Sequence, residues 1–456
     1  MHKSQIRDFT QGNITKQLLT FSLPLFMSNL LQVVYNMADM VVVGNVLGNT
    51  GVSSVSIGGD ISALLMFVAM GFSNAGQVII ARLIGARQTE RLGRFVGTMS
   101  GFLFVGAAVI SVIALLAQDM LLSLMRTPPE AREGALAYST ICMFGLVFIY
   151  GYNAVSAILR GMGDSKHPFL FISIAAMMNI VLDVLFVAGW GMGPGGAALA
   201  TVMSQGFSFV CCVVFLYRKR EAFQLDVRMH DFICWDAGML KDLILLGAPM
   251  AIKTASIQVS KLFVNSFINS YGVEVSAFAG IANKISSVAN LVSAAMNTAG
   301  STVVGQNIAA GKYDRVRHVM LAIAKITLTV AAICSLVFVF FSEPIFGLFT
   351  KAEDEAAVAA IAPGYVPIAV LLFFGASMRS IMNALINGSG HYKINFATAI
   401  LDGIVMRIGL AIMFGLVLNM KHYGFWLGDA LAGFTPFWIG LVFYMSGKWK
   451  NPVKRA

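Results

Sequence analysis

The sequence predicts an all-α integral membrane protein in which twelve transmembrane helices form two pseudo-symmetric lobes of six. Three observations lead to this prediction: a shortage of charge, a regular succession of long apolar runs, and an internal repeat. Charged residues make up 12% and hydrophobic residues 57% of the 456 residues, whereas soluble domains carry about 25% charge. Because the deficit extends along the whole chain, it indicates a membrane protein rather than a soluble protein with a large core.

Apolar runs of about 20 residues or more recur along the chain, which is the length that a helix needs to cross a bilayer. Turn sequences such as GNTG, TPPE and GMGPGG separate them. The polar start of the chain and the long first run do not fit a cleavable signal peptide, so none is expected. The predicted spans are 16–47, 53–82, 94–118, 134–160, 167–189, 195–217, 242–270, 275–308, 318–341, 357–387, 394–418 and 424–446.

The basic residues predict the orientation of these spans. With the N-terminus inside, the inner segments hold 22 Lys and Arg residues and the outer segments hold 4. Cytoplasmic loops of membrane proteins are enriched in basic residues, so both termini are expected in the cytoplasm. The net charge of +10 is therefore explained by topology, and nucleic acid is not expected as a partner.

The chain repeats itself with a period of about 225 residues. LLTFSLPL (18–25) matches LILLGAPM (243–250), which places Pro24 on Pro249, and ILRGMGDSKHPF (158–169) matches LINGSGHYKINF (385–396). Each repeat holds six spans, so both halves have the same orientation, as in a parallel repeat. The sequence predicts an N-lobe (1–217), a cytoplasmic linker (218–241) and a C-lobe (242–456), which face a central cleft and rock in alternating access, as in transporters.

Polar side chains lie in the outer half of the predicted N-lobe. Asp39 lies about 12 Å and Asp183 about 9 Å from the outer ends of their spans, at 1.5 Å per residue. Asn179 shares one helix face with Asp183, and Thr201 enters at a similar depth. A carboxylate inside a membrane costs at least ~3 kcal/mol, so such residues are candidates for function. The alternative is that the acids only hold helices together by hydrogen bonds, or that Thr201 bonds within its own helix.

Two carboxylates, an amide and a hydroxyl suit a hard monovalent cation or a proton. Oxygen ligands fit Na⁺, whereas soft metals favour Cys or His. Protonation is the other way to neutralise buried acids, because burial disfavours the charged form. The residues do not choose between H⁺ and Na⁺. The five cysteines show no CxxC spacing and are expected to be reduced and buried.

The C-lobe carries polar residues of a different kind. Its spans contain Gln258, Lys261 and Asn265 on one helix face, together with Arg379 and Asn383. These side chains are candidates for lining the cleft, as is Asp60 in the N-lobe. Alternatively, the lysines pair with Asp402 or Asp429. Lys253 and Lys284 have a further alternative, in which their side chains extend to a membrane interface.

At this point the sequence resembles the MATE (multidrug and toxic compound extrusion) transporters over essentially the whole chain. The resemblance rests on GNITKQLLTFSLPLFMSNLLQVVYNMADMVVVG, RGMGDSKHPF, NIVLDVLF with GGAALAT, and VVGQNIAAGKYDRVR. It implies an antiporter that expels organic, often cationic or amphipathic, compounds in exchange for H⁺ or Na⁺. The family's coupling-cation site falls on Asp39, Asn179, Asp183 and Thr201. Some members carry acids in the C-lobe where this chain has Gln258, Lys261, Arg379 and Asn383, which weakens the expectation of strongly cationic substrates.

We therefore expect a monomeric transporter in a bacterial inner membrane, with small organic molecules and the lipid bilayer as its partners. Neither an enzymatic activity nor a cofactor is expected beyond the transported H⁺ or Na⁺. One alternative is a flippase for a lipid-linked or anionic substrate, because the C-lobe lysines and Arg379 suit a pyrophosphate. A membrane receptor or enzyme is the other alternative, but the histidines fall outside span centres or at span ends and no nucleophile–base set is visible.

Overall fold

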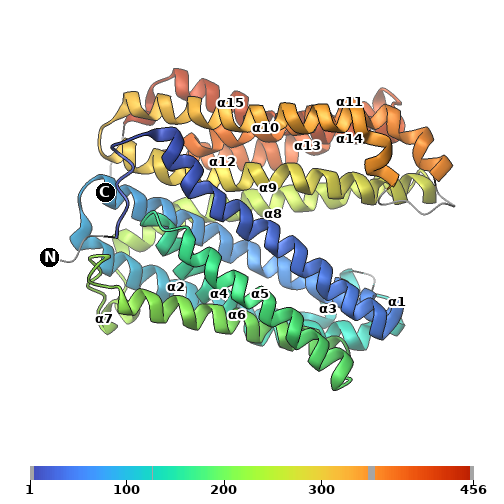
Figure 1. Ribbon diagram of the computed structural model, residues 1–456, viewed down its shortest axis with the longest axis horizontal. Coiled ribbons are helices and arrows are strands. Elements are labelled where there is room, and N and C mark those ends of the chain that lie inside the picture. The colour runs from blue at the N-terminus through green and yellow to red at the C-terminus, as the bar shows by residue number, and fades with distance from the viewer. Residues whose placement is uncertain (1–4, 126, 348–354, 452–456) are drawn as a thin grey trace. The chain divides into compact units, whose positions relative to one another are not determined.

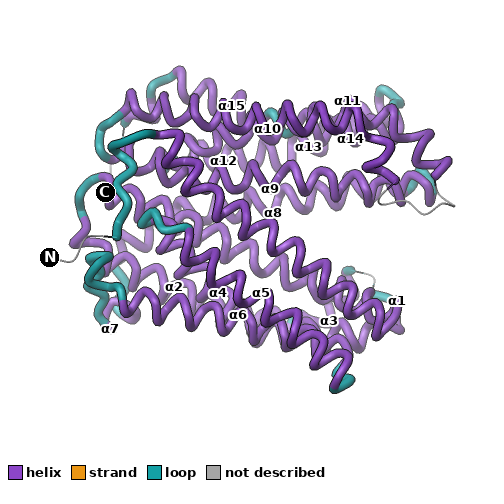
Figure 2. The backbone as a smooth tube through the Cα atoms, in the orientation of Figure 1, coloured by secondary structure: helices purple, strands orange, loops and turns teal. Residues whose placement is uncertain are grey.

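The protein, seen in a computed structural model, is helical along nearly all of the described residues, which are 5–125, 127–347 and 355–451 (Figures 1 and 2). No described residue lies in a β-strand. Within this part of the chain, 11 helical segments are long and apolar enough to cross a membrane. The first, α1 (Ile14–Gly85), is interrupted at Gly48, and its 72 residues are far too long for one span. It therefore supplies two, and the prediction of an all-α protein with twelve spans is confirmed.

The helix bounds follow the predicted spans closely. In the first half, α1 is followed by α2 (Leu92–Leu116), α3 (Gln118–Leu124), α4 (Pro129–Gly161), α5 (Lys166–Asp183) and α6 (Gly193–Arg218). After the short α7 (Met229–Ile233) come α8 (Ala237–Asn269), α9 (Val273–Ala309), α10 (Tyr313–Gly347), α11 (Glu355–Ser389), α12 (Tyr392–Ile400), α13 (Arg407–Ile412), α14 (Lys421–Ala432) and α15 (Thr435–Met445). Five basic residues of the orientation count lie outside the described residues: Lys3, Arg126, Lys351, Lys454 and Arg455.

The chain forms two compact units, and two of its helices belong to both. The first unit contains Leu23–Ala251 with the residues up to Asp8, and the second contains Phe9–Ser22 and Ile252–Arg455. The chain thus passes from one unit to the other inside α1 and again inside α8. Pro24 lies in α1 and Pro249 in α8, each within two residues of the crossing point. The repeat-matched first helix of each half is therefore shared between the units.

Close helix contacts recur at matched positions of the two halves. A Cβ on Gly161 of α4 would lie 2.9 Å from the Gln77 carbonyl oxygen of α1. A Cβ on its repeat partner, Gly388 of α11, would lie 2.8 Å from the Ser301 carbonyl oxygen of α9. Small residues let membrane helices approach each other this closely. Two residues further on, both halves have a glycine with positive φ, 87° at Gly163 and 72° at Gly390.

The charged connection between the halves, residues 218–241, packs along α2 in the first unit. A Cβ on Gly97 would lie 2.4 Å from the Cβ of Asp231, so only glycine allows this approach. The Arg94 guanidinium forms an ion pair with Asp236 at 3.2 Å. Three glycines of α2 at four-residue spacing face the connection: Gly93, Gly97 and Gly101.

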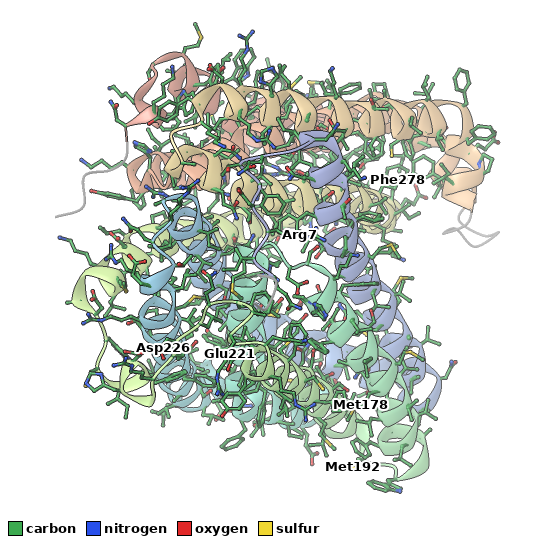
Figure 3. All side chains as sticks on the ribbon, turned by 60° about the vertical axis from the view of Figure 1, so that its left-hand side comes forward. Arg7, Met178, Met192, Glu221, Asp226 and Phe278 are labelled. Carbon is green, nitrogen blue, oxygen red and sulfur yellow. The ribbon has the colours of Figure 1, made fainter. Side chains whose placement is uncertain are left out.

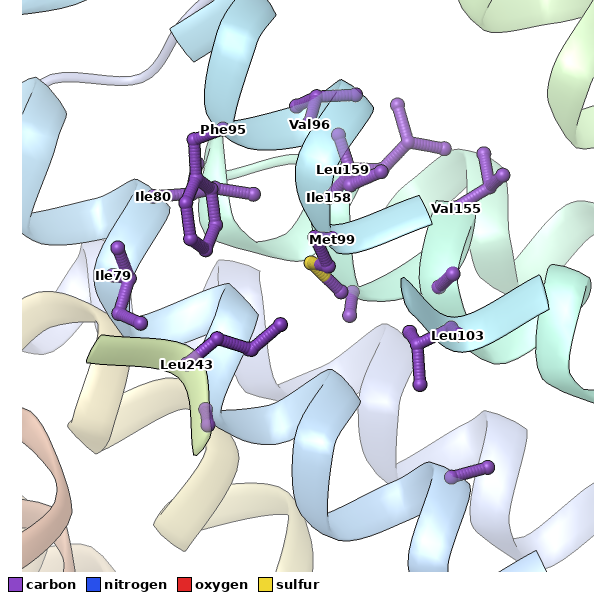
Figure 4. Close-up of a cluster of buried hydrophobic side chains, with 14 of the residues drawn as sticks. Ile79, Ile80, Phe95, Val96, Met99, Leu103, Val155, Ile158, Leu159 and Leu243 are labelled. Atoms are coloured by element: carbon purple, nitrogen blue, oxygen red, sulfur yellow. The ribbon is translucent and has the colours of Figure 1, made fainter. Parts of the chain in front are cut away.

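A buried apolar core holds the helices of the first unit together. Ile80 of α1, Phe95 of α2 and Leu159 of α4 meet there, and Leu243 from the start of α8 joins them (Figure 4). The second unit has its own core, in which Phe278 of α9 contacts Tyr365 and Trp426. Each unit thus buries apolar surface of its own.

The outside of the helices is apolar as well, as lipid contact requires. Large side chains exposed on it include Leu116, Phe144, Trp438 and Val442. The charged residue Glu221 follows α6 and lies at the opposite end of that helix from Met192, which precedes it (Figure 3). This arrangement fits a multi-pass membrane protein.

Candidate functional site

A polar layer inside the first unit contains the residues that the sequence singles out there. Asp39 lies on α1, Asn179 and Asp183 lie one turn apart on α5, and Thr201 lies on α6. Asp183 is the last residue of α5 and precedes a π-helical segment, Val184–Gly189. Such segments are rare and frequent at functional sites. The carboxyl groups of Asp39 and Asp183 lie within electrostatic range of each other.

Three of these side chains are buried and Thr201 is half-buried, and several polar atoms of the buried three have no hydrogen-bond partner among the described residues. Asp39 is 9% exposed, Asn179 3% and Asp183 0%. Among the described residues, no hydrogen bond reaches Asp39 Oδ1, either carboxylate oxygen of Asp183, or the side-chain amide of Asn179. Buried polar atoms are nearly always hydrogen-bonded. A purely structural role needs such bonds, so their lack at these atoms favours a site for a ligand.

Tyr138 of α4 belongs to the same layer, although the sequence analysis did not select it. It is buried, and its hydroxyl lies beside Thr201 and within electrostatic range of Asp39 and Asp183. Its place near the outer end of the predicted fourth span, at a depth similar to that of the acids, is the signal that could have identified it. A phenol adds a donor and an acceptor to the oxygen-rich layer.

A cavity of about 200 Å³ adjoins this layer. Tyr35, one turn before Asp39 on α1, lies beside Gln205 at its wall. Tyr35 and Gln205 are further polar residues that the sequence analysis missed. The cavity is lined by Tyr35, Ile172, Ala175, Ala176, Asn179, Thr201, Ser204 and Gln205.

The composition of the layer suits a hard cation or a proton. Its donors are carboxylate, amide and hydroxyl oxygens, which favour small hard cations. No group of three or more His, Cys, Asp or Glu side chains gathers within the described chain as in a transition-metal site. All five cysteines are free, and Cys234 is exposed, which corrects the expectation that every cysteine is buried.

The second unit contains a buried ion-pair triad. Arg407 is 2% exposed and Asp402 is 0% exposed. The Arg407 guanidinium donates to Asp402 Oδ1 at 3.1 Å from Nη2 and to Asp429 Oδ1 from Nη1. Both acids are therefore paired, but with an arginine rather than with the lysines that the sequence analysis considered.

Three further cations lie near this triad without carboxylate partners. Lys253 donates to Asn383 Oδ1 at 2.6 Å, and Arg379 donates from Nη2 to Asn290 Oδ1. Lys261 forms no ion pair with a described residue, although it lies within electrostatic range of both acids. The interior of the second unit thus differs in charge from the acidic layer of the first.

Two cavities adjoin these cations. The first, here called the polar cavity, has about 290 Å³ and is lined by Lys261, Ser286, Asn290, Leu372, Ala376, Arg379, Arg407, Asp429, Ala430 and Gly433. The second, here called the aromatic cavity, has about 380 Å³ and is lined by Lys261, Val264, Asn265, Ile268, Ala282, Asn283, Ser286, Tyr365, Ile368, Leu372, Trp426 and Asp429. The two cavities are adjacent, because both are lined by Lys261, Ser286, Leu372 and Asp429.

The predicted cleft residues fall into two groups. Lys261, Asn265 and Arg379 line one or both of these cavities. Gln258 lines neither of the two, Asn383 is buried against Lys253, and Asp60 is exposed on α1 in the first unit. Lys284 is also exposed. The sequence placed these residues on helix faces but did not show which of them share a cavity.

Comparison with known families identifies the class of protein. The MatE family model matches residues 24–185 and 249–413, one match in each half of the repeat. The chain therefore belongs to the MATE family of multidrug efflux transporters. It is a membrane transporter of small molecules and not an enzyme.

Known relatives cover nearly the whole chain. It is 26% identical over 443 residues to "Probable multidrug resistance protein YpnP" of Bacillus subtilis (strain 168), with 97% of each chain covered. It is 21% identical over 418 residues to "Multidrug export protein MepA" of Staphylococcus saprophyticus, with 91% of each covered.

Solved structures share the fold. A MOP superfamily transporter from Pyrococcus furiosus, described as having a binding pocket of reverse polarity, aligns with a TM-score of 0.90 at 23% identity over 99% of this chain and 100% of that chain. An outward-facing multidrug resistance MATE transporter aligns with a TM-score of 0.90 at 23% identity over 100% of both chains.

Proposed function

We propose that the protein exports amphipathic organic compounds in exchange for H⁺ or Na⁺, with Asp39 and Asp183 binding the coupling cation. The observation that carries this proposal is the pair of buried carboxylates of which Asp39 Oδ1 and both oxygens of Asp183 form no hydrogen bond with a described residue. A bound cation or proton neutralises the charge of these carboxylates. Asn179 and Thr201 complete the shell. The names of the relatives, multidrug resistance and multidrug export proteins, support drug-like cargo.

The coupling follows from charge. An empty site carries two buried negative charges, which is costly in a low-dielectric interior. Cation entry from outside neutralises them and changes the packing of α1 and α5. This event drives transport only if the cation binds one arrangement of the lobes (1–217 and 242–456) more tightly than the other. Substrate is then released outward as the cation enters.

Location and topology complete the proposal. The excess of 22 inner over 4 outer basic residues supports a position in the bacterial inner membrane with both termini in the cytoplasm. A monomer suffices for alternating access between two lobes. Reporter fusions at each terminus test the topology, and an active periplasmic reporter at either end would overturn it.

The test of coupling uses purified protein in liposomes. Ethidium and pyrenebutyrate are loaded in parallel, and a Na⁺ or a pH gradient is imposed. We expect one gradient to drive movement of at least one dye and Asp39→Asn to abolish this movement. The matched control is Asp119→Asn, because Asp119 is exposed and pairs only with Arg132 among the described residues. A wild-type rate in Asp39→Asn would refute the coupling role.

The alternative cargo is a lipid-linked or otherwise anionic substrate, as for a flippase. The unpaired cations of the second unit favour it, and the Pyrococcus furiosus transporter shares the fold with a pocket described as reversed in polarity. Depletion of the protein distinguishes the two: a growth defect without drug sensitivity indicates a lipid-linked cargo.

A further inference from the structure

We infer that the polar cavity of the second unit binds a carboxylate or phosphate group of an amphipathic substrate whose apolar body lies in the aromatic cavity. This inference rests on the proposed export function and names the class of its cargo. It assigns the anionic group to Lys261 and Arg379, and the apolar body to the neighbouring rings.

The charges near the polar cavity do not balance among the described residues. Lys261, Arg379 and Arg407 lie within electrostatic range of both Asp402 and Asp429, and a fourth cation, Lys253, lies within electrostatic range of Asp402. Arg407 already binds both acids. The other three cations have only neutral partners or none among the described residues, and the formal charge of the group is +2. Buried charge of this kind needs a counterion, and a substrate anion supplies one.

The donors at the cavity wall match an anion. Arg379 presents five N–H groups in a planar fork that fits carboxylate and phosphate, and only one hydrogen bond joins it to a described residue, Asn290. Lys261 lines the same cavity, and Ser286 adds a hydroxyl. Asp429 also lies on the wall, but its Oδ1 is bound by Arg407. A cationic group would meet three cations on this wall, Lys261, Arg379 and Arg407, against the single acid Asp429, whereas an anionic group meets the donors of Lys261 and Arg379.

The aromatic cavity fits the rest of such a molecule. Tyr365 and Trp426 line it, with ring centroids 5.2 Å apart and edge-to-face geometry. Val264 and Ile368 add aliphatic surface. Lys261 lies on the wall of both cavities, so an anionic head group in the polar cavity can continue into an apolar body in the aromatic cavity.

The experiment measures binding to the purified full chain without any gradient. Two probes share one apolar body and differ in charge: pyrenebutyrate and pyrenebutylamine. Energy transfer from tryptophan to pyrene reports binding, since Trp426 lines the aromatic cavity. The variants are Arg379→Gln and Lys261→Met, with Lys325→Gln as the control, because Lys325 is an exposed lysine of the same unit that lines neither cavity. Asp39→Asn is measured in parallel to separate this inference from the coupling proposal.

We expect the affinity for pyrenebutyrate to be at least about tenfold higher than the affinity for pyrenebutylamine. Each cavity variant should lose about tenfold in its affinity for pyrenebutyrate, the usual effect of one charge-assisted hydrogen bond. Lys325→Gln and Asp39→Asn should bind like the wild type. Competition by phosphatidylglycerol, but not by inorganic phosphate, would identify a lipid head group as the anion, and the reverse a soluble one. Equal or tighter binding of the amine refutes the inference, as does unchanged pyrenebutyrate affinity in both folded variants.

Discussion

Replacing Arg407 by methionine should destabilise the protein by about 3–5 kcal/mol, the cost of breaking a buried ion pair by removing one partner. Arg407 and Asp402 are 2% and 0% exposed, and the same guanidinium also binds Asp429. The substitution leaves two carboxylates inside the second unit without their cation. Methionine keeps much of the side-chain volume, so the loss reports charge rather than a cavity.

A surface pair of similar geometry gives the scale. Arg132 and Asp119 are 2.9 Å apart but 40% and 79% exposed, and exposed pairs contribute about 0–1 kcal/mol. Arg132→Met should therefore leave stability almost unchanged. Since the Arg407–Asp402 distance is 3.1 Å, the difference between the two variants isolates burial rather than distance.

Thermal and denaturant unfolding of the detergent-solubilised protein measures both variants. Arg407→Lys keeps a cation beside Asp402 and Asp429 and should retain part of the stability that Arg407→Met loses. The reasoning is refuted if Arg407→Met is as stable as Arg132→Met, or if Arg407→Lys is no more stable than Arg407→Met.

Three further predictions concern local packing. Gly97→Ala should destabilise the protein by about 1–3 kcal/mol through overpacking and expose the connection 218–241 to protease. Gly106→Ala on the same helix, which has open space around it, should have neither effect. Equal digestion of the two variants would contradict the packing argument. Gly163→Ala and Gly390→Ala should each lower the unfolding midpoint by the equivalent of about 1–2 kcal/mol, because both glycines have positive φ. Gly409→Ala, in open helical surroundings, is the control. An equal loss of stability in Gly409→Ala would count against the backbone explanation. Arg315→Ala should speed tryptic cleavage at Lys16, because Arg315 Nη2 donates hydrogen bonds to the carbonyl oxygens of Gln11 and Gly12, each at 2.8 Å. Arg317→Ala should leave the cleavage rate unchanged. Unchanged cleavage in Arg315→Ala would show that these hydrogen bonds do not fix the segment.

Most of the fold could be predicted because span length, turn residues and the repeat are local or periodic signals. The helix after Leu92 and the repeat-matched turns at Gly163 and Gly390 fall where the sequence suggests. The π-helical segment Val184–Gly189 could not be foreseen, because lipid-facing helices are apolar all round and their pattern does not report the helix period. The sharing of α1 and α8 between the units likewise depends on tertiary packing.

The candidate site was predictable in part for the same reason. Depth in the membrane follows from topology and helix rise, so Asp39 and Asp183 could be assigned to one layer. Tyr138 was missed because a tyrosine in an apolar span is usually a packing residue. The partner of Asp429 was also missed, since Lys261, Arg379 and Arg407 all lie within electrostatic range of it and only side-chain geometry selects Arg407.

The two shared helices have a mechanical consequence. Each of these helices has one end in each unit, so any rotation of one unit relative to the other must bend the helix between its two ends. Bending an intact helix stretches backbone hydrogen bonds, but proline has already removed one bond at its own position. Pro24 and Pro249 lie at the two crossing points. Each shared helix therefore lacks one backbone hydrogen bond close to the boundary between the units, and bending it there costs less than bending an uninterrupted helix.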